Sequence, residues 1–281
     1  MIKLLALDLD GTLLDAESRF FPGVHEAVMA AQAAGLEVVL VTGRSWRGAQ
    51  PFYQALSLKG RAICYLGALV VDGQTGAIIR HRPLVAEAWA QLRKLALAEQ
   101  LAVTACVGAD AAVEEGVLPA RNLLAADTAI ATRKADDFTA WEAWNPYTEI
   151  APDLAAAEGP PTMAAIYGDR AVQRVLAAFP GGLPESQFDL TDKIRGEMVL
   201  HVWHTDVDKG RALAAYCRYR GVLPAEVAAF GDAPMDLSMI KFAGLGVAVP
   251  DAHPALRAAA DLVAGPAEAI RHILQERGET A

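Results

Sequence analysis

The chain of 281 residues has few cysteines and no excess of positive charge, and each shortage limits the class of protein. The three cysteines, Cys64, Cys106 and Cys217, lie far apart and form no CxxC pair. A disulfide framework or a zinc–thiolate site is therefore not expected, and reduced, buried thiols are the ordinary alternative. The formal net charge of −9 argues against a broad nucleic-acid-binding surface, because such surfaces need clustered Lys and Arg. It still allows a small phosphorylated metabolite, bound in a local cationic pocket.

The sequence also lacks a long apolar run. No stretch approaches the roughly 18 uncharged apolar residues of a membrane span, and the short apolar run after Met1 ends in acidic residues, unlike a signal peptide. We therefore expect no membrane partner and a cytoplasmic location. Hydrophobic residues nevertheless make up 53% of the chain and charged residues 21%, so a substantial folded core is expected.

Short, nearly continuous apolar runs alternate with segments of helical character. The runs suit strands that are covered on both faces, and they occupy residues 4–7, 38–41, 62–66, 227–230 and 246–249. Helices are expected between them, at residues 22–34, 46–56, 209–220 and 235–242. This alternation predicts an α/β fold with a doubly wound, Rossmann-like parallel sheet. Ligands of such sheets bind beyond the carboxyl ends of the strands.

The middle of the chain departs from this rhythm. A hairpin is expected over residues 68–80, and the stretch after it is rich in Ala, Pro and Trp. We expect a core domain formed by residues 1–82 and 190–281, and an inserted α/β cap domain formed by residues 83–189. The cluster Arg80-His81-Arg82 lies at the junction and is expected to be a solvated linker, although it could attract an anionic substrate.

The strongest chemical signal is the run Asp8-Leu9-Asp10-Gly11-Thr12, directly after the first apolar run. Carboxylates at i and i+2 lie on the same side of an extended chain, and Gly11 permits a sharp change of direction. Both acids stay ionised only beside compensating positive charge. A hard divalent cation such as Mg²⁺ would supply it. The alternative is a polar strand end with solvated acids.

Three further motifs follow, or nearly follow, expected strands. Thr42-Gly43-Arg44 offers a hydroxyl and backbone N–H groups to a phosphate oxygen, although Thr is also a common helix cap. Lys209 lies at the expected first position of a helix, where a cation is unfavourable to the helix dipole. Either it has a function that requires this position, or it is an ordinary surface lysine. Asp232 and Asp236 place two acids after a later strand. All four motifs could converge on one edge of one sheet.

Together the motifs DLDGT, VTGR, DKG and GDAPMD resemble those of the haloacid dehalogenase superfamily of phosphohydrolases. The hairpin and the large insertion resemble the branch with a big α/β cap, called Cof-like or subclass IIB. The resemblance covers residues 1–82 and 190–281, and the insertion matches in position and size only. It implies a Mg²⁺-dependent phosphatase. Such an enzyme would hydrolyse a small phosphate monoester, a sugar phosphate or related metabolite, through an aspartyl-phosphate.

The resemblance also implies a role for each matched residue. Asp8 would be the nucleophile, and Asp10 would protonate the leaving oxygen and then deprotonate water. Mg²⁺ would be bound by Asp8, Asp232 and the backbone carbonyl of Asp10. The groups that hold the phosphoryl oxygens would be Thr42, Gly43 and Lys209, with Asp236 and Arg44 in supporting positions.

Three positions depart from the family pattern. Met235 and Leu66 stand where Asn is usual, and Pro250-Asp251 stands where Gly-Asn is usual. All three lie where substrate contacts or support for the site are expected. Two other functions stay open: a phosphotransferase or phosphomutase with the same intermediate, and a non-catalytic binding or regulatory module. The intact acidic and lysine motifs argue against the module, and Met235 favours it.

Overall fold

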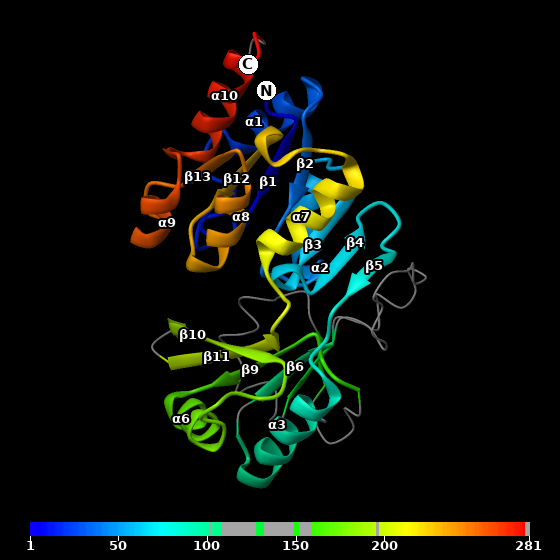
Figure 1. Cartoon of the computed structure of the whole chain (residues 1–281), viewed down its shortest axis with the longest axis vertical. Coiled ribbons are helices and arrows are strands. Elements are labelled where there is room, and N and C mark those ends of the chain that lie inside the picture. The colour runs from blue at the N-terminus through cyan, green and yellow to red at the C-terminus, as the bar shows by residue number, and fades with distance from the viewer. Residues whose placement is uncertain (102, 108–127, 132–148, 152–158, 195–196, 279–281) are drawn as a thin grey trace.

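The computed structural model describes residues 1–101, 103–107, 128–131, 149–151, 159–194 and 197–278 (Figure 1). A five-stranded parallel sheet forms the centre of one half, in the order β14–β13–β12–β1–β2. Its strands are β1 (Leu4–Leu7), β2 (Glu37–Leu40), β12 (Val227–Gly231), β13 (Leu245–Ala248) and β14 (Leu262–Val263). The central strand, β1, pairs in parallel with both β12 and β2.

Helices cover both faces of this sheet, as the sequence predicted. One face packs against α1 (Val24–Ala33), α2 (Trp46–Ala55) and α10 (Pro266–Glu276), and the other against α7 (Lys209–Arg220), α8 (Leu237–Phe242) and α9 (Pro254–Ala259). Successive residues of β1 divide between the two layers: Leu5 and Leu7 pack with the first, Leu4 and Ala6 with the second. Because both faces are buried, the strand is apolar throughout.

The third strand links the parallel sheet to a hairpin. β3 (Arg61–Cys64) pairs antiparallel with β4 (Leu69–Asp72), which pairs with β5 (Ile78–His81). A parallel bridge between Val41 and Ile63 joins β3 to the chain after β2. The expected strand through residue 66 ends at Cys64, because Tyr65 and Leu66 have φ angles of 47° and 58°. These left-handed residues form a 3₁₀ turn.

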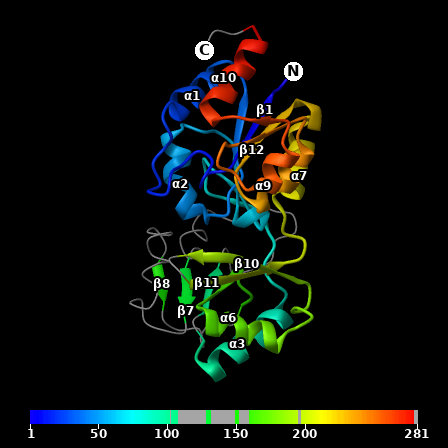
Figure 2. The same cartoon turned by 90° about the vertical axis from the view of Figure 1, so that its left-hand side faces the viewer.

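A second sheet forms the other half, in the order β10–β11–β9–β6–β7–β8. Its strands are β6 (Val103–Val107), β7 (Thr128–Ala131), β8 (Glu149–Ala151), β9 (Met163–Tyr167), β10 (Ser186–Ile194) and β11 (Glu197–His204). Two helices, α3 (Ala86–Glu99) and α6 (Asp169–Ala178), cover one face of it. Figures 1 and 2 place both helices on the side away from the parallel sheet. The opposite face is therefore turned toward the first half.

The expected boundary between the cap and the core at residue 190 does not coincide with the end of the second sheet. Residue 190 lies inside β10, and β11 pairs with both β10 and β9, so the second sheet continues to His204. The sequence pattern of a strand does not show which sheet the strand joins. The chain returns to the first half after His204, in the segment that leads into α7.

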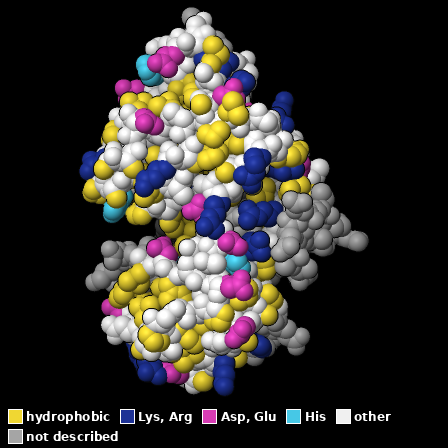
Figure 3. All heavy atoms as spheres, viewed as in Figure 1, with side chains coloured by type: hydrophobic (Ala, Val, Ile, Leu, Met, Phe, Trp, Pro, Cys, Tyr) yellow, Lys and Arg dark blue, Asp and Glu magenta, His cyan; other side chains and the backbone are white. Residues whose placement is uncertain are grey.

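The junction cluster is also less solvated than expected. The His81 side chain is buried, and its Nε2 lies 2.8 Å from Thr162 Oγ1, just before β9. Burial lowers the pKa of Arg80, and the charges of Arg82 and Arg218 lower it further. Figure 3 shows Lys and Arg side chains gathered where the two halves meet. The cluster is therefore packed structure, because a buried imidazole needs a polar partner.

No helix in the described ranges is both long and apolar enough to cross a membrane.

Candidate active site

The motif residues lie at the carboxyl edge of the parallel sheet. Asp8 follows β1, Thr42 follows β2, and Asp232 follows β12. Lys209 is the first residue of α7, which packs against α8. The carboxyl ends of parallel strands share one edge, so segments more than 200 residues apart in the chain meet there.

A buried ion network holds Lys209 between two carboxylates. Its Nζ donates to Asp8 Oδ1 at 2.7 Å and to Asp236 Oδ1 at 2.5 Å. The second oxygen of Asp236 accepts from the backbone N–H groups of Asp232 and Ala233, each at 3.0 Å. Burial opposes the charged lysine, but Asp236 and Asp8 outweigh it and raise the pKa of Lys209. The lysine therefore stays charged in the interior, where an unpaired charge would be costly.

The start of α7 is built to place that lysine. Asp208 caps the helix by accepting from the Arg211 N–H at 2.7 Å. The Gly210 N–H donates to Ser238 Oγ at 3.0 Å, and a Cβ on Gly210 would lie 2.6 Å from the Ser238 backbone. Only glycine allows this close approach of α7 to α8. The DKG motif thus has a packing reason for its glycine.

Asp8 and Asp232 leave negative charge that one lysine does not balance. Oxygens of Asp8, Asp232 and Asp236 all lie within 4.8 Å of one another, and they make the one candidate metal-binding cluster of the described residues. Burial raises the pKa of Asp8 well above its ordinary value, against the effect of Lys209. Burial and then Asp236 raise the pKa of Asp232 to about 6. Three carboxylates with a single ammonium partner fit a hard divalent cation.

The donor set fits this ion at Asp8 and Asp232 in particular. Asp236 has both oxygens engaged by Lys209 and backbone N–H groups, so it is a supporting group. A Cβ on Gly11 would lie 2.2 Å from Asp232 Oδ2, and the φ angle of Gly11 is +73°. The backbone after Asp10 therefore passes directly beside the Asp232 carboxylate. That approach suits a backbone carbonyl as a further ligand.

Asp10 is held apart from this cluster by Arg44. The guanidinium donates from Nε to Asp10 Oδ2 at 2.8 Å and from a terminal nitrogen to Asp10 Oδ1 at 2.5 Å. Arg44 is buried, donates also to Ser18 Oγ at 2.8 Å, and lies over the Phe52 ring. A bidentate pair of this kind fixes the orientation of the carboxylate. The sequence placed Arg44 in support without naming its partner.

Thr42 is not the cap of α2. Ser45 is that cap, because its hydroxyl accepts from the Gly48 N–H at 3.0 Å. Thr42 is fully buried, and its Oγ1 accepts from the Arg44 N–H at 3.1 Å. A Cβ on Gly43 would lie 3.4 Å from Leu66, so this loop packs on the left-handed turn. The capping alternative for Thr42 is therefore removed.

Two residues of the site were not predicted. Thr12 Oγ1 lies 3.2 Å from Asp8 Oδ2 and 3.4 Å from Asp232 Oδ1, between the two carboxylates. Its place in the first motif was the available signal. Ser18 holds Arg44 and carries no signal in the sequence. Met235, one of the departures from the family pattern, directly precedes Asp236 and is 36% exposed.

Comparison with known proteins places the whole chain in one group. A family model described as haloacid dehalogenase-like hydrolase matches residues 5–272. Pyridoxal phosphate phosphatase YbhA of Escherichia coli is 29% identical over 94% of this chain and 93% of its own length. Phosphatase YwpJ of Bacillus subtilis is 25% identical over 97% of this chain and all of its own.

Solved structures share the fold. A haloacid dehalogenase-like hydrolase from Bacteroides thetaiotaomicron superposes with a TM-score of 0.81 at 24% identity, covering 97% of this chain and 100% of its own. A subclass IIB sugar phosphatase superposes with a TM-score of 0.72 at 20% identity, covering 98% of this chain and 99% of its own. The parallel sheet and the second sheet are both part of this shared architecture.

Proposed function

Because the chain belongs to the haloacid dehalogenase-like hydrolases and is a phosphatase of that family, we propose that it hydrolyses small phosphate monoesters through a phosphorylated Asp8, with Mg²⁺ as cofactor. The observation that carries the proposal is the Asp8 carboxylate at the end of β1. Lys209 binds one of its oxygens, and the other lies near Thr12 on the side of Asp232. One oxygen is thus neutralised while the second is available to react.

In the first step Asp8 Oδ2 attacks phosphorus, and the bond between phosphorus and the ester oxygen breaks. Asp10 gives its proton to that oxygen, and the alcohol leaves. In the second step water attacks the phosphoryl group and passes a proton to Asp10. The bond from phosphorus to Asp8 then breaks and releases inorganic phosphate. Dividing the displacement in two lowers the barrier of each part.

The remaining residues bind and neutralise the transferred group. Lys209, Thr42 and the Gly43 backbone would hold the equatorial oxygens, whose charge must be balanced in the transition state. Mg²⁺, bound by Asp8, Asp232 and the Asp10 carbonyl, would supply further neutralising charge. Asp236 keeps Lys209 in place. Its own oxygens are fully occupied, so it would not compete for the substrate.

Arg44 sets a condition on Asp10. The bidentate pair engages both oxygens of Asp10, whereas Asp10 needs a free oxygen to exchange a proton with the leaving group. We expect Asp10 to part from Arg44 when substrate is bound, and to return to it afterwards. Arg44 is then a positioning residue for the general acid.

The face of the second sheet turned toward the site favours a ring-containing leaving group. In β11 the rings of His201 and Trp203 stack with centroids 5.9 Å apart, and Asp189 of β10 lies opposite His201. Trp203 belongs to the same buried cluster as Leu66, which packs on Gly43. Apolar and hydrogen-bonding groups of this kind suit a sugar or a heteroaromatic alcohol. Sugar phosphates and pyridoxal phosphate are therefore the first candidates.

The test is release of inorganic phosphate from p-nitrophenyl phosphate and from a panel containing these candidates. It is run with Mg²⁺ and with EDTA, on the wild-type chain, on Asp8→Asn and on Glu268→Gln. Glu268 is an exposed carboxylate of α10, so its variant is a matched control. Metal-dependent turnover that Asp8→Asn alone loses supports the proposal. Acid-quenched protein should carry phosphate on Asp8, and turnover without that label would contradict the intermediate.

A further inference from the structure

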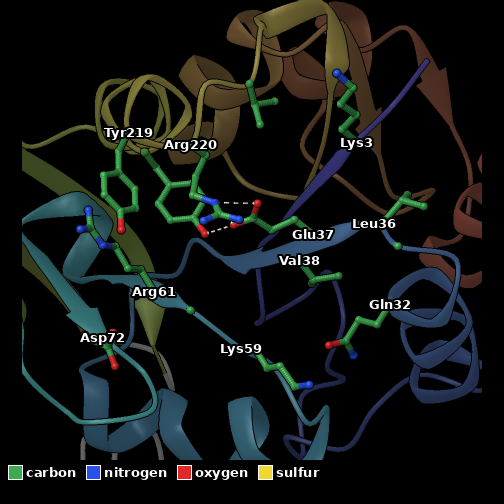
Figure 4. Close-up of a pocket in the computed structure, with 14 residues that line it drawn as sticks. Lys3, Gln32, Leu36, Glu37, Val38, Lys59, Arg61, Asp72, Tyr219 and Arg220 are labelled. Carbon is green, nitrogen blue, oxygen red and sulfur yellow. Dashed lines mark hydrogen bonds and ion pairs between the residues drawn. The ribbon is translucent and has the colours of Figure 1, made fainter.

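A pocket lies at the edge of the parallel sheet opposite the candidate active site, where β1, β2 and β3 begin (Figure 4). Its volume is about 710 Å³, which falls within the range of small-molecule sites. The last turn of α7 also lines it, with Tyr216, Tyr219 and Arg220. α7 runs from Lys209 to Arg220, so about 16 Å separates this pocket from the catalytic lysine. The pocket is thus not part of the phosphatase site.

The pocket is cationic in a chain whose net charge is −9. Its lining has two acidic side chains, Glu37 and Asp72, and four cationic ones, Lys3, Lys59, Arg61 and Arg220. Lys3 pairs with Glu226 at 2.7 Å and Arg220 with Glu37 at 2.9 Å. Lys59 and Arg61 form no ion pair within the described part of the chain. These two side chains therefore supply the positive excess of the pocket, and the remaining carboxylate, Asp72, offsets only one of them.

Arg61 is held by an aromatic ring and not by a carboxylate. Its guanidinium carbon lies 3.5 Å from the centroid of the Tyr219 ring. Figure 4 shows the two side chains next to each other. Stacking engages the face of the guanidinium and leaves the N–H donors at its edge available. Asp72 is the partner of Arg61 across β3 and β4, but its Oδ1 accepts from the backbone of Gln74 and Thr75. The planar donor set is therefore held in place without a ligand.

Glu37 does not cancel this charge, because it is already neutralised. The Tyr216 hydroxyl donates to one oxygen of Glu37, and Arg220 Nε donates to the other at 2.9 Å. Burial and then Glu37 raise the pKa of Tyr216 above its ordinary value. The hydroxyl thus remains a donor to Glu37, and the carboxylate is occupied.

We propose that this pocket binds a small polyanionic metabolite, with Arg61 donating through its edge and Lys59 as the second cation. The shared chemistry is a cluster of oxyanion oxygens, and either phosphate or carboxylate groups could supply it. Tyr219 acts by orienting Arg61. The proposal concerns binding only and is independent of the phosphatase chemistry at Asp8.

The test is isothermal titration of the full chain with pyrophosphate and, separately, with citrate. It is run in EDTA at constant ionic strength, because exposed charges are screened by salt. Removing one charge-assisted contact should weaken binding, by about tenfold or more for Arg61→Gln and by about threefold to tenfold for Lys59→Gln. Lys94→Gln removes an exposed lysine of α3 in the other half of the molecule. It should bind within about twofold of the wild-type chain.

The possible outcomes separate cleanly. No binding of either anion by the wild-type chain up to about 10 mM, or equal binding by Arg61→Gln, overturns the proposal. Preference for one anion identifies the chemical class. Arg61→Lys keeps the charge but loses the planar set of donors, so its affinity should be lower than that of the wild-type chain and higher than that of Arg61→Gln. It serves as the test variant if Arg61→Gln does not fold. A wild-type chain that binds the anion but hydrolyses no ester would retain this pocket and remove the proposed function.

Discussion

The two ends of helix α7 present cations in opposite settings. At its first residue Lys209 is buried between Asp8 and Asp236, in a cluster where carboxylates outnumber cations. At its last residue Arg220 has a side chain 47% exposed and pairs with Glu37, in a pocket where cations outnumber carboxylates. The same helix therefore closes a carboxylate-rich site at one edge of the sheet and a cationic pocket at the other.

The contrast between buried Lys209 and half-exposed Arg220 shows how burial changes the energy of an ion pair. In the interior each charge depends on its partner, because water cannot replace it. At the surface water and salt compensate for most of a lost partner. Similar contacts at the two ends of α7 should therefore have very different energies, and matched variants can test that contrast.

The largest effect is expected from removing the proposed nucleophile, Asp8. Asp8→Asn should lower phosphatase kcat by a factor of about 10³ or more, because the amide cannot form the covalent intermediate. Glu37→Gln makes the same chemical change at the other edge of the sheet and should leave kcat within about twofold. Steady-state kinetics on the best substrate of the panel measure both. Substantial turnover by Asp8→Asn would locate the chemistry elsewhere.

Matched substitutions at the two ends of α7 test the stability contrast. Lys209→Gln leaves Asp8 and Asp236 without their cation and should lower the free energy of unfolding by about 3–5 kcal/mol. Arg220→Gln removes an exposed partner and should cost less than about 1 kcal/mol. Urea denaturation in EDTA gives both values. Equal losses in the two variants would contradict the argument from burial.

Matched variants of the Arg44–Asp10 and Arg220–Glu37 pairs test whether the shape of the guanidinium matters or only its charge. Arg44→Lys keeps the charge beside Asp10 but loses the bidentate fork. We expect kcat to fall by about tenfold, with a smaller change in KM, because Asp10, the proposed general acid, is misplaced. Arg220→Lys makes the same change beside Glu37 and should leave both constants unaltered. A loss confined to KM in Arg44→Lys would assign Arg44 to substrate binding instead.

The smallest effect concerns Tyr216 and its dependence on pH. Its pKa is raised above the ordinary value of 10.0 in the folded chain, so the folded state keeps the phenol proton at a pH where the unfolded state loses it. This contribution to stability is complete below about pH 10 and is lost as the pH rises further. Tyr216→Phe should cost about 1 kcal/mol at pH 8, and its stability should fall less steeply above pH 10. An equally steep fall for the wild-type chain and Tyr216→Phe, measured by urea unfolding on both sides of pH 10, would contradict this.

Much of the fold of the half that contains the parallel sheet could be predicted from the sequence. Its apolar runs predicted the parallel sheet, because a strand buried on both faces has no polar positions. Two expected elements begin and end where the structure has them, at residues 4–7 and 209–220. The motif residues could be placed near one another from the order of strands and helices, since parallel strands share a carboxyl edge.

Contacts between distant side chains could not be read in the same way. The pairing of Asp10 with Arg44, the burial of His81 and the stacking of Arg61 on Tyr219 each join residues from different elements. The membership of β11 in the second sheet is a further case. None of these leaves a periodic pattern in the chain.

The sequence by itself determined the sheet, its helical layers and the set of groups at the carboxyl edge. These features depend on local burial and on the end of each strand, and both are encoded by neighbouring residues. The tertiary structure alone decided the partner of each charge, the extent of the second sheet and the cationic pocket at the amino edge. The physical reason is that electrostatic pairing and stacking depend on distance in space, which the packing of whole elements sets.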